Sequence, residues 1–253
     1  MVFENKTIIL TGASSGIGKA LAGNLVKEKC RLILIARRKD ILEKFAAENK
    51  NHNAEVFVYQ CDVSNKEDVT KTFSEIITKF GKIDIAVLNA GTGQNVSVEN
   101  YDSKYADEIF GVNILGMIYC VEQLLPGLIK QRAGMIVGVS SLADNRGYSG
   151  SGFYCASKAA ATIYLEGLRV ELKKYGVKVI TVKPGFVKTP MTDKNDFDMP
   201  LIMHADKAAN IILNGIKKEK RIIQFPLPIS LSAKVIGLMP SWMYEFIAGF
   251  RKQ

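Results

Sequence analysis

Hydrophobic residues along the chain gather in seven short runs rich in β-branched side chains, separated by longer stretches of mixed polarity. The runs are TIIL at 7–10, RLILIA at 31–36, EVFVYQ at 55–60, DIAVL at 84–88, MIVGVS at 135–140, VKVITV at 177–182 and RIIQF at 221–225. Such runs predict strands buried on both faces of a sheet. The stretches between them are long enough for helices. Ser64 with Glu67 predicts a capping box that opens a helix running to about Phe80.

The alternation of strands and helices predicts the fold class. Parallel strands need crossover connections, so helices lie on both faces of the sheet. We expect an α/β fold, a Rossmann-type doubly wound parallel seven-stranded sheet flanked by helices. The 253 residues fit a single domain, 1–253, with an apolar tail from about residue 226. Ligands of such folds bind at the carboxyl ends of the strands, so functional residues are expected in the loops just after them.

The amino-acid composition is that of a globular protein in a reducing compartment. Hydrophobic residues make up 47% and charged residues 23%, which are ordinary values for a globular protein. The chain begins MVFENKTIIL, without a basic segment followed by a long apolar one, and it has no C-x-x-C motif. We therefore expect a reducing, cytoplasmic location. The cysteines are Cys30, Cys61, Cys120 and Cys155.

The formal charge of +9 favours anionic partners, such as a phosphorylated cofactor, nucleic acid or an acidic membrane. The basic residues are dispersed, and no zinc-finger, basic-zipper or RNP-like motif is present, so we expect no nucleic-acid partner. His52 and His204 stand far apart, without Cys or carboxylate neighbours at metal-ligand spacing. We expect no metal site.

The first strand is followed directly by TGASSGIG, whose glycines Gly12, Gly16 and Gly18 allow a tight turn and close approach of a pyrophosphate. The helix that follows offers backbone donors at its N-terminus. Glycines also simply make turns, but a motif that opens a helix in the first βαβ unit predicts dinucleotide binding. The intervening residues expected to join the site are Ser14, Ser15 and Ile17.

Arginines follow the second strand, where an NAD site would usually place an Asp or Glu for the ribose 2′-hydroxyl. Arg37, alone or together with Arg38, is expected to hold a 2′-phosphate and so select NADPH. The alternative is a pair of solvated charges at a helix start. After the third strand, Asp62 either bonds the adenine amine or is a turn residue, and Val63 beside it is placed in the same site.

The fourth strand ends in NAG, Asn89, Ala90 and Gly91, whose small residues would let a cofactor ribose lie against the backbone. A purely structural turn explains the same residues. Asn113, within the apolar run FGVNILGMIY, is costly to bury without partners, so it either braces the backbone or holds a water.

Tyr154 and Lys158 are four residues apart in a helical segment and so share one face. A tyrosine with a pKa of about 10 is a poor acid–base catalyst at neutral pH, and a neighbouring ammonium lowers that pKa. A surface pair or a core tyrosine would look the same. The fifth strand ends with Ser140 and Ser141, either of which could donate a hydrogen bond to a developing alkoxide.

These motifs together resemble the short-chain dehydrogenase/reductase family in its NADP(H)-preferring form. The resemblance covers residues 5 to about 192 and rests on TGASSGIG, NAG, Asn113, Ser141, the YCASK run and PGFVKT. It implies that Tyr154 is the acid–base catalyst and that Lys158 binds the nicotinamide ribose and tunes Tyr154. It also implies that Ser141 polarises the carbonyl, being preferred over Ser140 for its spacing of thirteen positions before Tyr154, and that Asn113 supports a proton-relay water.

The resemblance further implies a segment that contacts the nicotinamide amide, formed by Pro184, Gly185, Val187 and Thr189. Many NADP-preferring relatives carry a basic residue in the glycine loop where this chain has Ser15, so cofactor choice depends on Arg37. Between Thr189 and the next predicted helix lie some fifteen residues, fewer than the substrate lid of many relatives. The implied partners are a small-molecule substrate and further copies of the chain, in a homodimer or homotetramer.

The expected activity is NADPH-dependent reduction of a ketone or aldehyde, hydrophobic or lipid-like, to an alcohol. The alternatives are an NADP(H)-binding sensor without net turnover, and an isomerase or epimerase that uses bound nicotinamide transiently.

Residues 222–250 are rich in Ile, Leu, Met and aromatic residues, with KKEKR before them and RK after them. Prolines and charges interrupt every window of membrane-spanning length. Such a tail either packs on the core, the substrate pocket or another subunit, or it anchors the protein on a membrane surface, with Trp242, Tyr244 and Phe246 at the interface.

Overall fold

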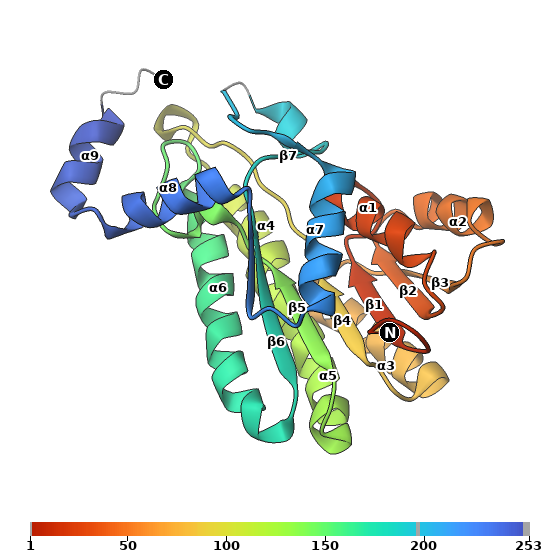
Figure 1. Ribbon diagram of the computed structural model, residues 1–253. Coiled ribbons are helices and arrows are strands. Elements are labelled where there is room, and N and C mark those ends of the chain that lie inside the picture. Colours follow the sequence, from red (N-terminus) through yellow and green to blue (C-terminus); the bar gives the residue numbers. More distant parts are fainter. Residues whose placement is uncertain (1, 196–197, 250–253) are drawn as a thin grey trace.

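The computed structural model contains one central parallel sheet of seven strands, in the order β3-β2-β1-β4-β5-β6-β9, with helices on both faces (Figure 1). It describes residues 2–195 and 198–249. The predicted doubly wound fold is confirmed, and all seven predicted strands are present. They are β1 Thr7–Thr11, β2 Arg31–Ala36, β3 Glu55–Gln60, β4 Ile85–Leu88, β5 Met135–Val139, β6 Lys178–Pro184 and β9 Ile222–Phe225.

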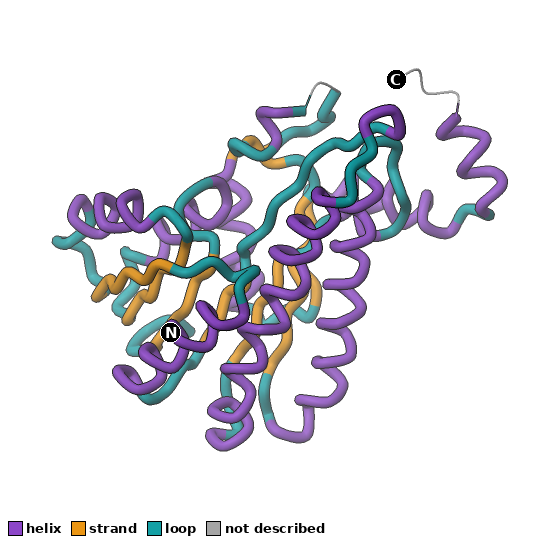
Figure 2. Tube along the Cα trace, turned by 180° about the vertical axis from the view of Figure 1, so that it is seen from behind, coloured by secondary structure: helices purple, strands orange, loops and turns teal. Residues whose placement is uncertain are grey.

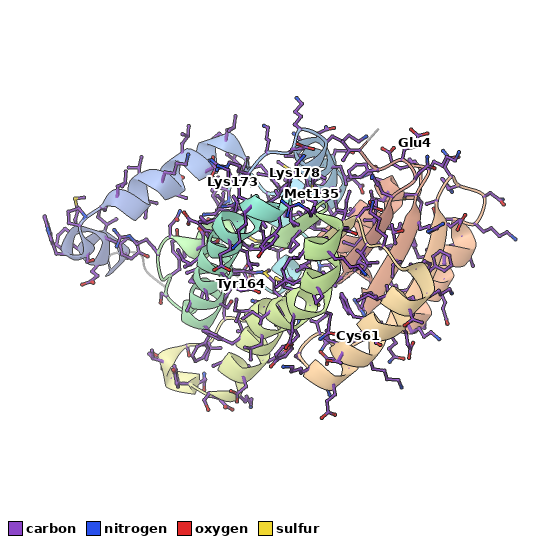
Figure 3. All side chains as sticks on the ribbon, turned by 90° about the horizontal axis from the view of Figure 1, so that it is seen from below. Glu4, Cys61, Met135, Tyr164, Lys173 and Lys178 are labelled. Carbon is purple, nitrogen blue, oxygen red and sulfur yellow. The ribbon has the colours of Figure 1, made fainter. Side chains whose placement is uncertain are left out.

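Two hydrophobic layers hold the helices against the sheet. Helices α1 Gly16–Leu25, α2 Lys39–Glu48 and α7 Ala205–Lys217 pack on one face, around side chains such as Leu10 and Leu34. Helices α3 Lys66–Phe80, α5 Gly116–Gln131 and α6 Gly152–Leu172 pack on the other face. The remaining helices near the sheet are α4 Lys104–Phe110, the π-helical turn η2 Gly111–Leu115 and the short 3₁₀ turns η1 Val98–Asn100, η3 Leu142–Asp144, η4 Lys173–Tyr175 and η5 Thr192–Lys194. In Figure 3, seen from below, side chains fill the space between these layers.

Two local features differ from the sequence prediction. The prediction that Ser64 and Glu67 form a capping box is wrong. Asn65 is the N-cap of α3, and its side chain accepts hydrogen bonds from the N–H groups of Glu67 and Asp68. The Ser64 hydroxyl instead donates to Asp62 at 2.7 Å. A second, two-stranded sheet pairs β7 Val187–Lys188 with β8 Met203–His204. Strands of two residues leave no recognisable hydrophobic pattern, so this sheet was not predicted.

After β9 the chain leaves the sheet in two apolar helices, α8 Leu227–Leu238 and α9 Ser241–Gly249. They project sideways from the body at the end where the strands have their carboxyl termini (Figures 1 and 2). The last residue of the predicted apolar tail, Phe250, lies outside the described residues.

One continuous helical stretch, Lys104–Gln131, is long and apolar enough by composition to cross a membrane. It comprises α4, η2 and α5, and its buried residues, such as Val121 and Leu124, belong to the core beside the sheet. The core helix of a globular fold accounts for the same composition.

Candidate active site

The loop between β1 and α1 forms a cradle that has no room for side chains. Gly12 has φ +68°, and a Cβ there would lie 2.8 Å from the Ala90 Cα, while a Cβ on Gly18 would lie 2.1 Å from the Gly12 carbonyl oxygen. Ser15 is the N-cap of α1 but makes no capping hydrogen bond through its side chain. The N–H groups of the first turn of α1 are therefore available to an anion.

Residues at the end of β4 hold this loop in place. Asn89 and Ala90 donate their N–H groups to the Thr11 hydroxyl at 3.0 and 3.1 Å, and the Asn89 amide donates to the carbonyls of Thr11 and Gly12. Thr11, the first residue of the glycine motif, was not singled out from the sequence. The NAG segment thus has a structural role in the turn between β1 and α1.

The arginines that follow β2 flank the outer end of the glycine loop. The Arg38 guanidinium donates to the Ser14 hydroxyl at 2.9 Å, and Arg37 lies 3.9 Å from the Asp62 carboxylate. Asp62 also accepts hydrogen bonds from the N–H and the hydroxyl of Ser64, as a turn residue does. Val63 is buried in the core.

Tyr154, from the first turn of α6, meets Ser141 at the end of β5, and the two side chains are hydrogen-bonded. Ser140 points elsewhere: its hydroxyl donates to the Lys158 carbonyl at 2.8 Å, which ties β5 to α6. Of the two candidate serines, Ser141 is therefore the one beside the tyrosine.

Lys158 lies below the tyrosine ring and is buried, with its Nζ 5.7 Å from the ring centroid. Its ammonium donates to the Val139 carbonyl at 3.1 Å. A Cβ on Gly91 would lie 3.3 Å from both the Lys158 Nζ and the Asn113 Oδ1. The ends of β4 and β5, the turn η2 and α6 thus bring these predicted residues together.

Asn113 sits in the π-helical turn η2, a distortion that is frequent at functional sites. Its side-chain oxygen accepts from the Thr92 N–H at 2.8 Å, and its amide donates to the Thr92 carbonyl and to the Ser157 hydroxyl, both at 2.9 Å. The sequence left two roles open for Asn113, and the structure shows the first of them, in which its side chain braces the backbone at Thr92.

The segment after β6 lies against the glycine loop. Pro184 ends the strand, Gly185 donates its N–H to the Phe225 carbonyl at 2.7 Å, and Val187 is buried in β7. Thr189 bonds within its own turn, its N–H donating to the Thr192 hydroxyl at 2.9 Å. Its methyl group would lie 3.0 Å from a Cβ on Gly16, so this segment directly adjoins the glycine loop.

The electrostatics differ from the sequence expectation for Tyr154. Burial raises the pKa of its phenol above the usual value, the Ser141 hydrogen bond opposes this rise, and the Asp144 carboxylate adds to it. Burial also lowers the pKa of Lys158 to about 8. The expected depression of the tyrosine pKa by the ammonium is not found, since burial has the largest effect on the pKa of Tyr154.

A buried ion pair that the sequence did not suggest stands behind Tyr154. The Lys183 ammonium lies 2.7 Å from an Asp144 carboxylate oxygen, with side-chain exposures of 15% and 1%. The Thr162 hydroxyl donates to the same oxygen at 2.5 Å, whereas the other oxygen, Oδ1, has no partner within the part of the chain that the structure describes. Lys183 is therefore the counter-charge of a carboxylate whose remaining effect on Tyr154 is to raise its pKa.

Gly93 was also missed, although its lack of a side chain is essential to the site. A Cβ there would lie 2.9 Å from the Tyr154 Cδ2. We expect Gly93→Ala to displace the ring and lower kcat by about tenfold or more, because misplacement of a catalytic group by about 1 Å is that costly. Steady-state kinetics check this. Gly147→Ala is the matched control, since a Cβ there meets nothing within 4 Å, and equal losses in both variants would contradict the prediction.

The depressed pKa of Lys158 predicts a pH-dependent stability difference. The pKa of Lys158 is about 8 in the folded protein and 10.5 in the unfolded chain. Between these pH values the unfolded chain binds more protons, so the contribution of Lys158 to stability rises with pH there. We expect Lys158→Met to be more stable than the parent at pH 7 by about 3 kcal/mol, with the difference vanishing near pH 10.5. Urea unfolding across this range measures it, and a difference independent of pH would contradict it.

Comparison with known proteins identifies the family. The family model for short chain dehydrogenase matches residues 6–199 of the chain. The chain therefore belongs to the short-chain dehydrogenase/reductase family, as its motifs indicated, and it is an oxidoreductase that uses a nicotinamide nucleotide.

Individual relatives agree with this assignment. An 11-beta-hydroxysteroid dehydrogenase-like protein of Arabidopsis thaliana is 36% identical over 234 residues, which are 88% of this chain and 75% of the relative. A Burkholderia phymatum short chain dehydrogenase/reductase in complex with NAD has a TM-score of 0.84 at 24% identity, covering 92% of this chain and 93% of its own. An alcohol dehydrogenase of the archaeon Thermococcus sibiricus, complexed with 5-hydroxy-NADP, has a TM-score of 0.79 at 29% identity, covering 88% and 95%.

Proposed function

We propose that the protein is an NADPH-dependent carbonyl reductase in which Tyr154 delivers the proton. The observation that carries this proposal is the hydrogen-bonded pair of Tyr154 and Ser141, with Lys158 beneath the ring, beside an anion cradle flanked by two arginines. A sensor that only binds the cofactor has no need of this acid–base arrangement.

The cleft fits a dinucleotide with a 2′-phosphate. Gly12, Gly16 and Gly18 leave the space that a pyrophosphate needs above the free N–H groups of α1. Arg37 and Arg38 lie at the outer end of this cradle, where the adenosine ribose of the cofactor would lie. No carboxylate occupies the positions directly after β2 that would bind a ribose 2′-hydroxyl and repel the phosphate.

The residues of the chain have distinct roles in carbonyl reduction. The nicotinamide, when bound, supplies a hydride to the carbonyl carbon. Ser141 donates a hydrogen bond to the carbonyl oxygen and stabilises the charge that develops there. Tyr154 transfers its phenolic proton to that oxygen, which completes the alcohol, and Lys158 lies beneath the ring of the tyrosine. Alcohol oxidation uses the same residues in reverse.

We further propose that the substrate is hydrophobic. Exposed apolar side chains lie in loops and helices that follow the carboxyl ends of the strands. They include Val98 and Tyr101 after β4, Leu201 and Ile202 between β7 and β8, and Leu227 at the start of α8. The steroid-dehydrogenase-like name of the Arabidopsis relative is consistent with such a substrate.

An oligomer is proposed on a separate observation. Ile163 and Val170, two turns apart on α6, are 67% and 73% exposed on a face that points away from the sheet. Apolar residues so placed suit contact with a second copy, in a homodimer or homotetramer.

Cofactor choice provides a test at the level of single residues. We expect the double change Arg37→Ala and Arg38→Ala to raise the KM for NADPH by about 10- to 100-fold, since charge-assisted hydrogen bonds to a phosphate contribute about 1.5–3 kcal/mol. The KM for NADH should change little. Steady-state kinetics with both cofactors measure this, and an equal rise for both would show that the arginines do not recognise the 2′-phosphate.

The proposal as a whole is tested by following NADPH oxidation at 340 nm against hydrophobic ketones, aldehydes and 3-ketoacyl compounds. Turnover with net loss of NADPH supports a reductase. Tight NADPH binding without turnover of any compound supports the sensor, and substrate conversion without net loss of NADPH supports an isomerase or epimerase.

A further inference from the structure

Helices α8 and α9 expose a set of large apolar side chains, here called the tail stripe. Within each helix its members recur every three or four residues, and all of them are exposed, Leu238 to 86% and Trp242 to 72%. The tail stripe consists of Leu227, Leu231, Val235, Leu238, Trp242 and Phe246. Soluble proteins rarely expose so many neighbouring large apolar side chains without a partner surface.

The orientation of the tail stripe is fixed by polar contacts on the opposite side of the helices. Arg146, from the loop after η3, donates its Nε to the Ile236 carbonyl at 3.1 Å and a terminal nitrogen to the Gly237 carbonyl at 3.2 Å and to the Met239 carbonyl. Its guanidinium lies 5.1 Å from the centroid of the Tyr244 ring, and the Tyr244 hydroxyl donates to the Gly147 carbonyl at 2.6 Å. The tail is thus clamped to the body with its apolar side outward.

Packing on the core does not account for this surface. Buried residues of α8, such as Ser230 and Ala233, face the body, whereas α9 has no buried residue among those described up to Gly249. In Figures 1 and 3 the two helices extend beyond the side-chain-filled body. The tail stripe is therefore accessible to a binding partner outside the molecule.

Charge indicates what covers the stripe. Residues 227–249 contain only Lys234 and Glu245 as charged residues, in a chain of net charge +9. Lys234 shares the outward face with Leu231, Val235 and Leu238, at helical spacing. Burying that lysine against a second copy would be costly, whereas its ammonium can extend to lipid phosphates while its stem stays among acyl chains.

We propose that the tail stripe docks the protein on the surface of an anionic lipid bilayer. Docked in this way, the exposed apolar side chains enter the acyl region and Trp242 lies at the headgroup level. The docked surface adjoins the active site, because α8 begins directly after Pro226, whose Cδ would lie 3.1 Å from a Cβ on Gly185. This docking does not depend on the proposed reaction.

The sole tryptophan, Trp242, reports the docking directly. The full-length protein is mixed with phosphatidylcholine vesicles that contain or lack phosphatidylserine, and co-sedimentation and tryptophan emission are measured. We expect binding that needs phosphatidylserine and weakens with salt, a shift of the emission to shorter wavelength, and quenching by brominated acyl chains. An emission spectrum that vesicles leave unchanged would overturn the proposal.

Matched variants locate the surface. Leu231→Gln with Leu238→Gln removes two members of the stripe and keeps Trp242, and it should lower the vesicle partition coefficient by at least about tenfold. The control, Ile222→Gln, changes an exposed apolar residue at the start of β9 and should bind vesicles like the parent. Equal binding by the parent and the stripe variant overturns the proposal. A tryptophan shift without vesicles that follows protein concentration, with a doubled mass in sedimentation, overturns it in favour of a second copy.

Discussion

Tyr154→Phe should lower kcat for carbonyl reduction by about 10²–10⁴-fold, the range that a positioned proton donor contributes. The change removes only the hydroxyl, so the ring continues to pack beside Gly93 and above Lys158. The glycine loop and the arginines after β2 are untouched. Binding of NADPH, followed by fluorescence titration, is therefore expected to stay within about twofold of the parent.

Measuring both kcat and NADPH binding distinguishes loss of the catalytic proton donor from loss of the folded structure. Ser141→Ala serves as a companion variant, because it removes the hydrogen bond to Tyr154 and the donor to the substrate while leaving Ser140 to join β5 to α6. We expect it to lower kcat as well. If Tyr154→Phe retained full activity, another group would have to supply the proton, and the proposed mechanism would be wrong.

Lys183→Met should lower the free energy of unfolding by about 3–5 kcal/mol, because it leaves the Asp144 carboxylate buried without its counter-charge. The carboxylate already has one oxygen without a partner among the described residues, so it has little else to compensate the loss. Urea denaturation at pH 7 measures the effect. An unpaired Asp144 should also raise the pKa of Tyr154 further and move the pH profile of kcat/KM toward higher pH.

The double variant Lys183→Met with Asp144→Leu provides the control. Replacing both charges with apolar side chains of similar size is often neutral or stabilising, so most of the lost stability should return. The pH profile should then lie at or below that of the parent, because the carboxylate that raises the pKa of Tyr154 is gone. A single variant as stable as the parent would show that the pair is solvated and has no such role.

The sequence predicted those features whose signals are local. The seven strands were visible because each is a short run of apolar residues, and Tyr154 and Lys158 because a spacing of four places both on one helix face. The glycine loop was visible because close packing at Gly12 and Gly18 excludes every other residue. In these cases one segment of sequence is sufficient to define the geometry.

Features that depend on tertiary contacts were not predicted. Lys183 and Asp144 lie on β6 and η3, and nothing in either segment suggests that the fold joins them. The pKa of Tyr154 is raised because burial and Asp144 act on it in the folded protein, which spacing to Lys158 cannot reveal. At the start of α3 two neighbouring residues could cap the helix, and Asn65 does so while Asp62 accepts the hydrogen bond of the Ser64 hydroxyl.

The segment from Ser141 to Gly147 connects the active site to the C-terminal helices α8 and α9. Its first residue meets Tyr154, and its last two hold α8 and α9 through the Arg146 guanidinium and the Gly147 carbonyl. The C-terminal helices are consequently not an independent module. A chimera that transplants them onto a related enzyme must therefore carry residues 142–147 as well. In relatives whose C-terminal helices differ in sequence from α8 and α9, we expect Arg146 to be replaced too.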